Sequence, residues 1–178
     1  MATDWLLCSY RLPREPSRLR LAVWRRLKRV CAVMVHDGLW VLPSDAKTRE
    51  DFEWLAEEIE ERDGSVMLWE ARSLQGGQDS TVVLKFRAEA EARYAAIAQA
   101  ASKLARAGKR RGSPARSVEK AMQQLRGLER TLRLERRRDY FRASGRQEAE
   151  ESVAAAAADL RSRARPITPE RRLNAVGN

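Results

Sequence analysis

Arginines gather in segment 11–20, where an expected strand turns into an expected helix. Pro13 and Pro16 stiffen the turn, and Ser17 can cap the first free N–H groups of the helix. A helix N-terminus favours an anion, and guanidinium groups match phosphate and other tetrahedral oxyanions. The segment therefore predicts an oxyanion site; the alternative is a solvated basic face, or arginines that pair with an acidic helix. The expected anion-binding residues are Arg11, Arg14, Ser17, Arg18 and Arg20.

A second set of cations follows helical spacing later in the chain. Leu125, Leu128 and Leu132 form an apolar stripe, and arginines recur beside it over residues 126–138. Such a helix could lie along a nucleic-acid backbone, where each phosphate contact releases counterions, or could be the outer face of a bundle. Because no exposed aromatic residues are interleaved with these arginines, duplex DNA suits them better than a single strand. The expected DNA-binding residues are Arg25, Arg26, Lys109, Arg110, Arg111, Arg126, Arg130, Arg133 and Arg137.

The charge of the chain is divided unevenly. The 178 residues carry a formal net charge of +10, yet residues 1–80 hold 12 Lys and Arg against 14 Asp and Glu. The whole positive excess therefore lies in residues 81–178, and a strongly basic region favours nucleic acid as a partner.

Other residue types offer little for catalysis. One histidine, His36, and two cysteines, Cys8 and Cys31, are too few for most metal sites or a disulfide framework. We interpret the cysteines as small core residues at strand positions and His36 as a surface residue of a hairpin. No P-loop, G-x-G-x-x-G or G-x-S-x-G sequence is present. The sequence favours a binding protein over an enzyme, and we expect neither a metal nor a cofactor.

Strands and helices alternate over residues 1–75, which we expect to form one domain. The pair Asp37-Gly38 between two apolar runs predicts a tight hairpin. Thr48 and Asp51 resemble a capping box at the start of the second helix, and Gly64 suits its C-terminal end. The order βαββαβ predicts an α+β fold of the ferredoxin-like type. The expected strands are 5–11, 32–36, 39–42 and 65–72, and the expected helices begin at Ser17 and Thr48.

Apolar residues at spacings of three and four predict helices over most of residues 79–166, after a loop at 75–80. The expected breaks are a basic loop near 108–113 and the pair Ser144-Gly145. Short loops imply antiparallel neighbours, so we expect a helical hairpin or bundle. Residues 167–178 look like a flexible tail.

Several runs of the sequence resemble a known family. Tyr10-Arg11-Leu12-Pro13, Pro16-Ser17-Arg18-Leu19-Arg20 and Asp37-Gly38-Leu39-Trp40 are similar to the N-terminal domain of ChrB, a chromate resistance protein. Phe86-Arg87-Ala88 and Arg138-Asp139-Tyr140-Phe141 resemble later segments of the same family. The resemblance covers roughly residues 4–142 and implies transcriptional control of a chromate efflux operon. Longer members carry a further C-terminal domain that we do not expect here.

The expected ferredoxin-like half also resembles the middle domain of PaaX-type repressors and certain CRISPR-associated endoribonucleases. Those nucleases carry a metal-binding Asp at the end of the first strand, where this chain has Ser9-Tyr10-Arg11. A metal-dependent ribonuclease is therefore the weakest of three hypotheses.

Our first hypothesis is a regulator that binds duplex promoter DNA. The second is a non-catalytic accessory module that binds chromate or another oxyanion, or a protein. No apolar run is long enough to span a membrane and no basic leader precedes the first strand, so we expect a cytoplasmic protein. Because an open sheet leaves unpaired edges, we also expect a homodimer through the ferredoxin-like half.

Overall fold

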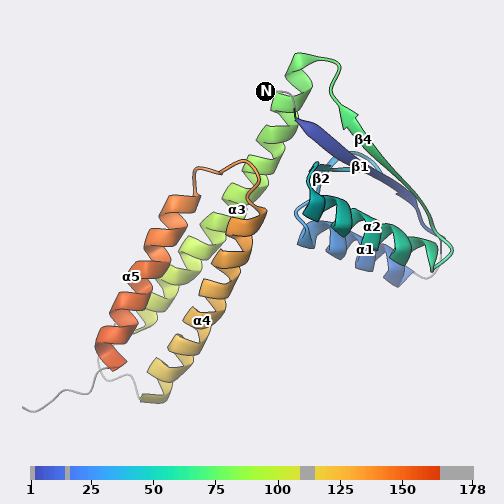
Figure 1. Cartoon of the computed structure of the whole chain (residues 1–178). Helices are drawn as coiled ribbons and strands as arrows, with labels where there is room; N and C mark the ends of the chain where they lie inside the picture. Colours follow the sequence, from blue (N-terminus) through green and yellow to red (C-terminus); the bar gives the residue numbers. More distant parts are fainter. Residues whose placement is uncertain (1–2, 15–16, 109–114, 165–178) are drawn as a thin grey trace, which may run out of the picture. The chain divides into compact units, whose positions relative to one another are not determined.

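A computed structural model describes residues 3–14, 17–108 and 115–164 as two compact units (Figure 1). Within these residues, the first unit comprises the chain up to Arg93 together with Leu134–Arg146. The second comprises Tyr94–Arg133 and the chain from Gln147 onward. None of the helices in the described ranges is long and apolar enough to cross a membrane.

The first unit contains a four-stranded antiparallel sheet with the order β2-β3-β1-β4. Helices α1 and α2 cover one of its faces (Figure 1). This order confirms the ferredoxin-like fold that the sequence predicts. The elements are β1 (Asp4–Arg11), α1 (Ser17–Arg29), β2 (Val33–His36), β3 (Leu39–Pro43), α2 (Ala46–Glu60) and β4 (Ser65–Arg72).

The core beneath α1 and α2 follows from periodicity in the sequence. Leu19, Val23 and Leu27 of α1 are buried at spacings of four, as predicted. Strand residues on the same sheet face alternate with outward ones, because successive side chains of a strand point to opposite faces. The buried partners of this layer are Leu6, Cys8, Trp40, Leu42, Phe52, Leu55 and Ile59.

The opposite face of the sheet is covered by chain segments far from it in sequence. The ring of Trp5 stacks on Phe86 with 6.0 Å between centroids, and Phe141 lies 5.3 Å from Phe86. Tyr140 meets Phe86 edge-on at 5.9 Å. The aromatic cluster of these four residues therefore joins the sheet to the start of the helical region.

The N-terminus of α2 differs from the prediction. The helix begins at Ala46, and its cap is Asp45, whose carboxylate accepts a hydrogen bond from the backbone N–H of Thr48 at 2.8 Å. Thr48 returns the bond by accepting from the N–H of Asp45 at 3.0 Å. Thr48 is thus the third helical residue of the capping box rather than its cap, and Asp51 plays no part in it. The Thr48 hydroxyl also donates to the carbonyl of Pro43.

The C-terminal cap of α2 differs from the prediction by one residue. The N–H of Gly64 donates to the carbonyl of Ile59 at 3.0 Å, and the N–H of Asp63 donates to Glu60 at 3.2 Å. This pair of bonds is a Schellman motif, and its left-handed residue is Asp63, with φ of 58°, not Gly64. Cys31 (φ 59°) ends α1 in the same way, so our placement of Cys31 on a strand was wrong.

Glycine at position 64 is required by close packing instead. A Cβ there would lie 2.6 Å from Cγ2 of Ile59 and 3.1 Å from the carbonyl oxygen of Arg11. Because Ile59 is fully buried and the Arg11 oxygen belongs to β1, neither atom has room to withdraw.

We therefore expect Gly64→Ala to lower the free energy of unfolding by about 1–3 kcal/mol, measured by urea denaturation. Gly127→Ala is the control, because a Cβ at that helical position meets nothing within 4 Å. This control should gain about 0.5–1 kcal/mol from alanine's higher helix propensity. A loss at Gly64 below about 0.5 kcal/mol would contradict the close packing.

The rest of the described chain is helical, as predicted. Helix α3 (Gly76–Gly108) starts inside the segment 75–80 that we expected to be a loop, so that expectation was wrong. Helix α4 (Ala115–Arg138) buries Leu125 and Leu132 of the predicted stripe, while Leu128 is half-buried. Helix α5 (Arg146–Ala164) contributes small buried residues to the core of the second unit, among them Ala149, Ala156 and Ala157.

Candidate functional site

The residues of the predicted oxyanion site lie around the start of α1. Ser17 is the first residue of that helix, and its first turn holds no acidic residue. Arg11, Arg14 and Arg18 are exposed. The guanidinium of Arg20 is also exposed and donates to the carbonyl oxygen of Arg14, which ties the helix to the preceding turn. The arrangement leaves Arg14 and Arg18 as the exposed cations nearest the helix start, and anion binding there stays a prediction.

Arginines on α4 form a single exposed row, the α4 row, made up of Arg126, Arg130, Arg133 and Arg137. Their spacing of four, three and four places them on one face of the helix. At a rise of 1.5 Å per residue, the row extends for about 16 Å. Lys109, Arg110 and Arg111, which we also predicted to bind DNA, lie outside the described residues.

Acidic residues of α4 near this row are held by other partners. Glu129 lies 3.8 Å from Arg161, and Glu135 lies 2.6 Å from Arg93. Each of these carboxylates thus has a cationic partner outside the α4 row. None of the four arginines of the row forms an ion pair with a carboxylate of the described residues, so the row is a run of positive charge.

Two predicted DNA-binding residues meet in a pocket that the sequence did not reveal. Arg26 of α1 and Arg137 of α4 line a cavity of about 590 Å³ in the first unit, which we call the basic pocket. Arg25, in contrast, is exposed on α1 and does not line it. The complete lining is Arg26, Arg29, Val30, Asp45, Lys47, Thr48, Asp51, Leu134, Arg137, Arg138 and Tyr140.

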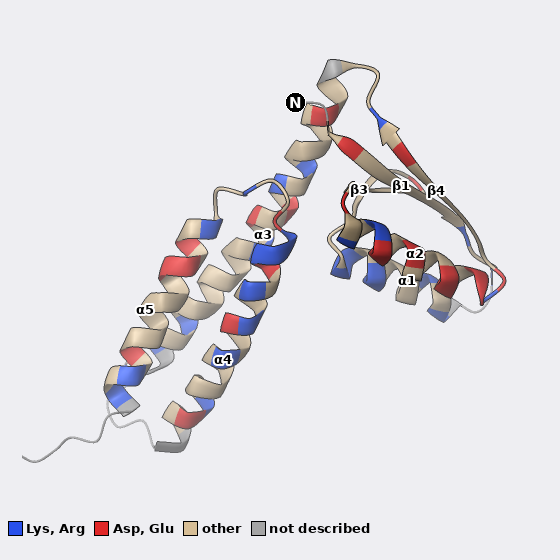
Figure 2. Ribbon diagram, in the orientation of Figure 1, with Lys and Arg blue, Asp and Glu red and all other residues tan. Residues whose placement is uncertain are grey.

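The two acids of the basic pocket already have partners. Asp51 forms an ion pair with Lys47 at 2.6 Å, and Asp45 caps α2. Within the described part of the chain, no carboxylate lies within ion-pair distance of Arg26, Arg29, Arg137 or Arg138. Figure 2 shows Lys and Arg along α1 and Asp and Glu along α2. The lining therefore carries four guanidinium groups that form no ion pair with the described residues.

Tyr140 forms one wall of the basic pocket and holds two elements together. Its hydroxyl donates to the carbonyl oxygen of Val30 at 3.1 Å, which links the chain after α4 to the end of α1. Burial raises the pKa of Tyr140, so its hydroxyl stays protonated and remains a donor.

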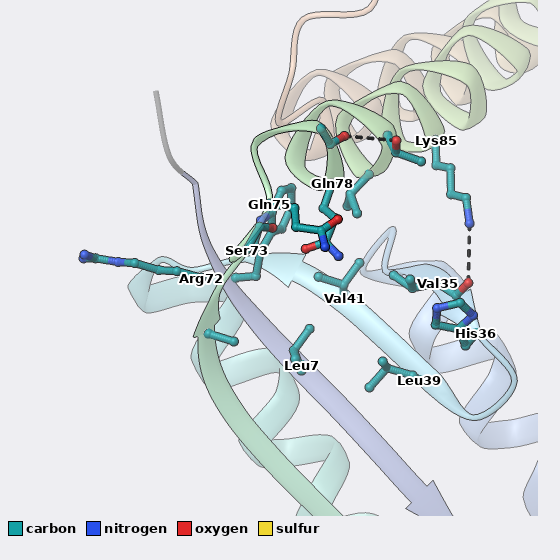
Figure 3. A pocket seen from close by; sticks show the side chains of 15 residues that line it. Leu7, Val35, His36, Leu39, Val41, Arg72, Ser73, Gln75, Gln78 and Lys85 are labelled. Carbon is teal, nitrogen blue, oxygen red and sulfur yellow. Dashed lines mark hydrogen bonds between the residues drawn. The ribbon is translucent and has the colours of Figure 1, made fainter.

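A second cavity, of about 620 Å³, lies between the sheet and the start of α3 (Figure 3). Leu7, Leu39 and Val41 point into it from the sheet, and Gln78 and Lys85 come from α3. Asp79 anchors this end of α3, because its carboxylate accepts hydrogen bonds from Ser73 and from the indole N–H of Trp5. These bonds lower the pKa of Asp79. The cavity is mainly apolar and offers Lys85 as a cation at its rim.

The cysteines and the histidine show no arrangement for catalysis among the described residues. Burial raises the pKa of Cys8 to about 12 and also raises the pKa of Cys31, which disfavours the reactive thiolate form. His36 is exposed and lines the apolar cavity. In the described ranges, no three His, Cys, Asp or Glu residues gather in a way that could hold a metal ion.

Two segments that carry the sequence resemblance pack against each other. Phe86 contacts Tyr140 and Phe141, and the side chain of Arg87 donates to the carbonyl oxygen of Phe141 at 3.1 Å. The segments are more than 50 residues apart in the chain, and their contact closes the first unit next to the basic pocket. Arg29, Arg138 and Tyr140 also line that pocket, although none of them was predicted as a site residue. The available signal was the run Arg136-Arg137-Arg138 just before Tyr140.

The chain matches a known family over most of its length. Residues 20–169 match the family described as "Protein ChrB, N-terminal". Protein ChrB of Cupriavidus metallidurans is 30% identical over 78 residues, which are 44% of this chain. The matched region spans only 24% of that relative. No solved structure matches the chain.

Proposed function

Since the chain belongs to the family of the N-terminal part of protein ChrB, we propose that it acts in the regulation of chromate resistance by binding duplex DNA. The observation that carries the proposal is the α4 row, with four exposed arginines on one helical face. Such a row suits the phosphate backbone, where each neutralised phosphate releases counterions. Contacts of this kind fix the position of a protein on DNA but do not read the base sequence.

Binding to the promoter of a chromate-resistance operon is the experiment that tests this function. A gel-shift titration should show retardation that weakens steeply between about 50 and 200 mM salt, as expected for several phosphate contacts. The promoter fragment should bind more tightly than a scrambled duplex of equal length. Adding chromate should change the promoter affinity and leave that of the scrambled duplex unaltered. No retardation at low salt would rule the function out.

Exposed Arg14 and Arg18 at the start of α1 support a second candidate function, in which the chain is a non-catalytic module that binds an oxyanion. In that case the protein would bind a small anion and would show no salt-dependent affinity for a duplex. The same gel-shift series separates the two candidates, because only the first predicts a shifted band.

We also propose that the chain forms a homodimer through the first unit. Strand β4 is at an edge of the sheet, and its side chains Met67 and Trp69 are 60% and 41% exposed. An edge strand with exposed apolar residues is a template for pairing with another chain.

Light scattering at tens of micromolar is expected to give twice the chain mass. Trp69→Lys should yield a monomer, because a charge on the edge strand opposes pairing. Trp54→Lys, at a position on α2 that is 57% exposed, should leave the dimer intact. A monomeric wild type, or dissociation of both variants alike, would contradict the proposed interface.

A further inference from the structure

We propose that the basic pocket binds a phosphate group, and that it does so mainly through Arg26, Arg29 and Arg138, which lie outside the α4 row. The cations come from two helix ends that are about a hundred residues apart in sequence. Arg26 and Arg29 belong to the last turn of α1, and Arg137 and Arg138 to the last turn of α4. All four line one cavity.

Cations in a last helical turn stabilise the helix dipole, which accounts for arginines on each helix considered alone. The helix dipole does not explain why arginines from two different helices line the same cavity. Four like charges around one cavity repel one another, and neither of the pocket's acids pairs with them. An anion between the guanidinium groups would replace this repulsion with charge-assisted hydrogen bonds.

The polar groups of the wall are already satisfied. The Thr48 hydroxyl donates to Pro43, and the Tyr140 hydroxyl donates to Val30. The donors left for a ligand are therefore the guanidinium groups, whose planar forks fit the oxygens of a phosphate. Lys47 is held by Asp51 and is not needed for the site.

The cavity has more room than a single oxyanion needs. Its volume is about 590 Å³, and Val30, Leu134 and Tyr140 supply an apolar wall beside the arginines. The shared chemistry is thus a phosphate-type group, either on a small molecule or on a nucleic-acid backbone. The two sources can be separated by experiment.

Calorimetric titration of the full chain with inorganic phosphate, with AMP and with a short duplex provides the test, in a chloride buffer of low ionic strength. The pocket variant is Arg26→Gln/Arg138→Gln. Its control is Arg49→Gln/Arg62→Gln, which removes the same charge from α2 and from the turn that follows it, outside the pocket. Thermal melts check that both variants fold, and Arg26→Gln/Arg29→Gln, which leaves the α4 row intact, is a second pocket variant.

We expect the wild type to bind phosphate or AMP saturably, and each pocket variant to bind it at least about tenfold more weakly, as befits the loss of two charge-assisted contacts. The control should stay within about twofold of the wild type. If only the duplex binds, and the pocket variants lose more duplex affinity than the control, the phosphate source is nucleic acid and the proposal holds. Equal affinities in pocket and control variants for all three ligands would overturn it. A failure of promoter recognition alone would not overturn the proposal, because inorganic phosphate and AMP contain no duplex.

Discussion

Replacing Phe86 with alanine is expected to lower the free energy of unfolding by about 3–5 kcal/mol. Phe86 is 5% exposed and contacts three other aromatic rings, from β1 and from the chain that follows α4. Truncation removes the buried ring and leaves a cavity that rigid aromatic neighbours cannot fill. Each lost ring pair adds about 0.5–1.5 kcal/mol beyond area burial. Because a domain's total stability is about 5–15 kcal/mol, the first unit should come close to unfolding.

Urea denaturation followed by tryptophan fluorescence measures this effect, since Trp5 lies against Phe86. Leu84→Ala is the matched control: it lies in the same helix, but its side chain is 63% exposed. Its cost should stay within about 0.5 kcal/mol. A cost for Phe86→Ala below about 1 kcal/mol would mean that the start of α3 and the segment around Tyr140 do not stabilise the sheet.

The fold was predictable because its elements carry local signals. The Asp37-Gly38 pair does form the turn between β2 and β3, with Gly38 at a φ of 76°. The apolar spacing of Leu19, Val23 and Leu27 likewise identified α1 and the face that it buries. Order and type of the elements follow from such patterns, and the βαββαβ order restricts the ways in which the sheet can form.

The ends of elements were less predictable because competing local partners exist. Asp45 and Thr48 are both good capping residues three positions apart, and the sequence does not say which of them comes first in the box. The early start of α3 has a tertiary cause. Hydrogen bonds from Trp5 and Ser73 hold Asp79 in the first turn, which outweighs the low helix propensity of Gly76 and Gly77.

The candidate sites differ in the same way: those within one element could be predicted, and the one that joins several elements could not. The α4 row could be predicted from the sequence, because all of its members belong to one helix and helical spacing alone places them together. The basic pocket could not, since it joins α1, the start of α2 and the end of α4, and only tertiary packing places Arg26 and Arg137 in the lining of one cavity. The predicted oxyanion site at the start of α1 is local too, and its ligand stays a prediction.

If the α4 row contacts DNA phosphates, Arg126→Gln/Arg130→Gln/Arg133→Gln should reduce duplex affinity by about two to three orders of magnitude at 0.1 M salt. The slope of log K against log salt should become shallower by about 2.7, because each lost phosphate contact removes about 0.9. Glutamine retains the side-chain stem and has a helix propensity close to that of arginine, so α4 should stay folded. All three residues are exposed, which keeps the effect on stability small.

A control with the same loss of charge separates specific contacts from the general attraction of a basic protein to DNA. Arg49→Gln/Arg62→Gln/Arg72→Gln removes three exposed arginines, each of which pairs with an acid of the first unit. Because these charges are already compensated by neighbours, their removal should change duplex affinity by less than about threefold and the salt slope by less than about 0.5. Filter-binding or fluorescence-anisotropy titrations at four or more salt concentrations give both quantities. Equal losses in the two triple variants would mean that net charge alone attracts the duplex. An unchanged slope in the α4 variant would mean that the row is a solvated helix face, and the DNA contacts would then have to be sought elsewhere in the chain.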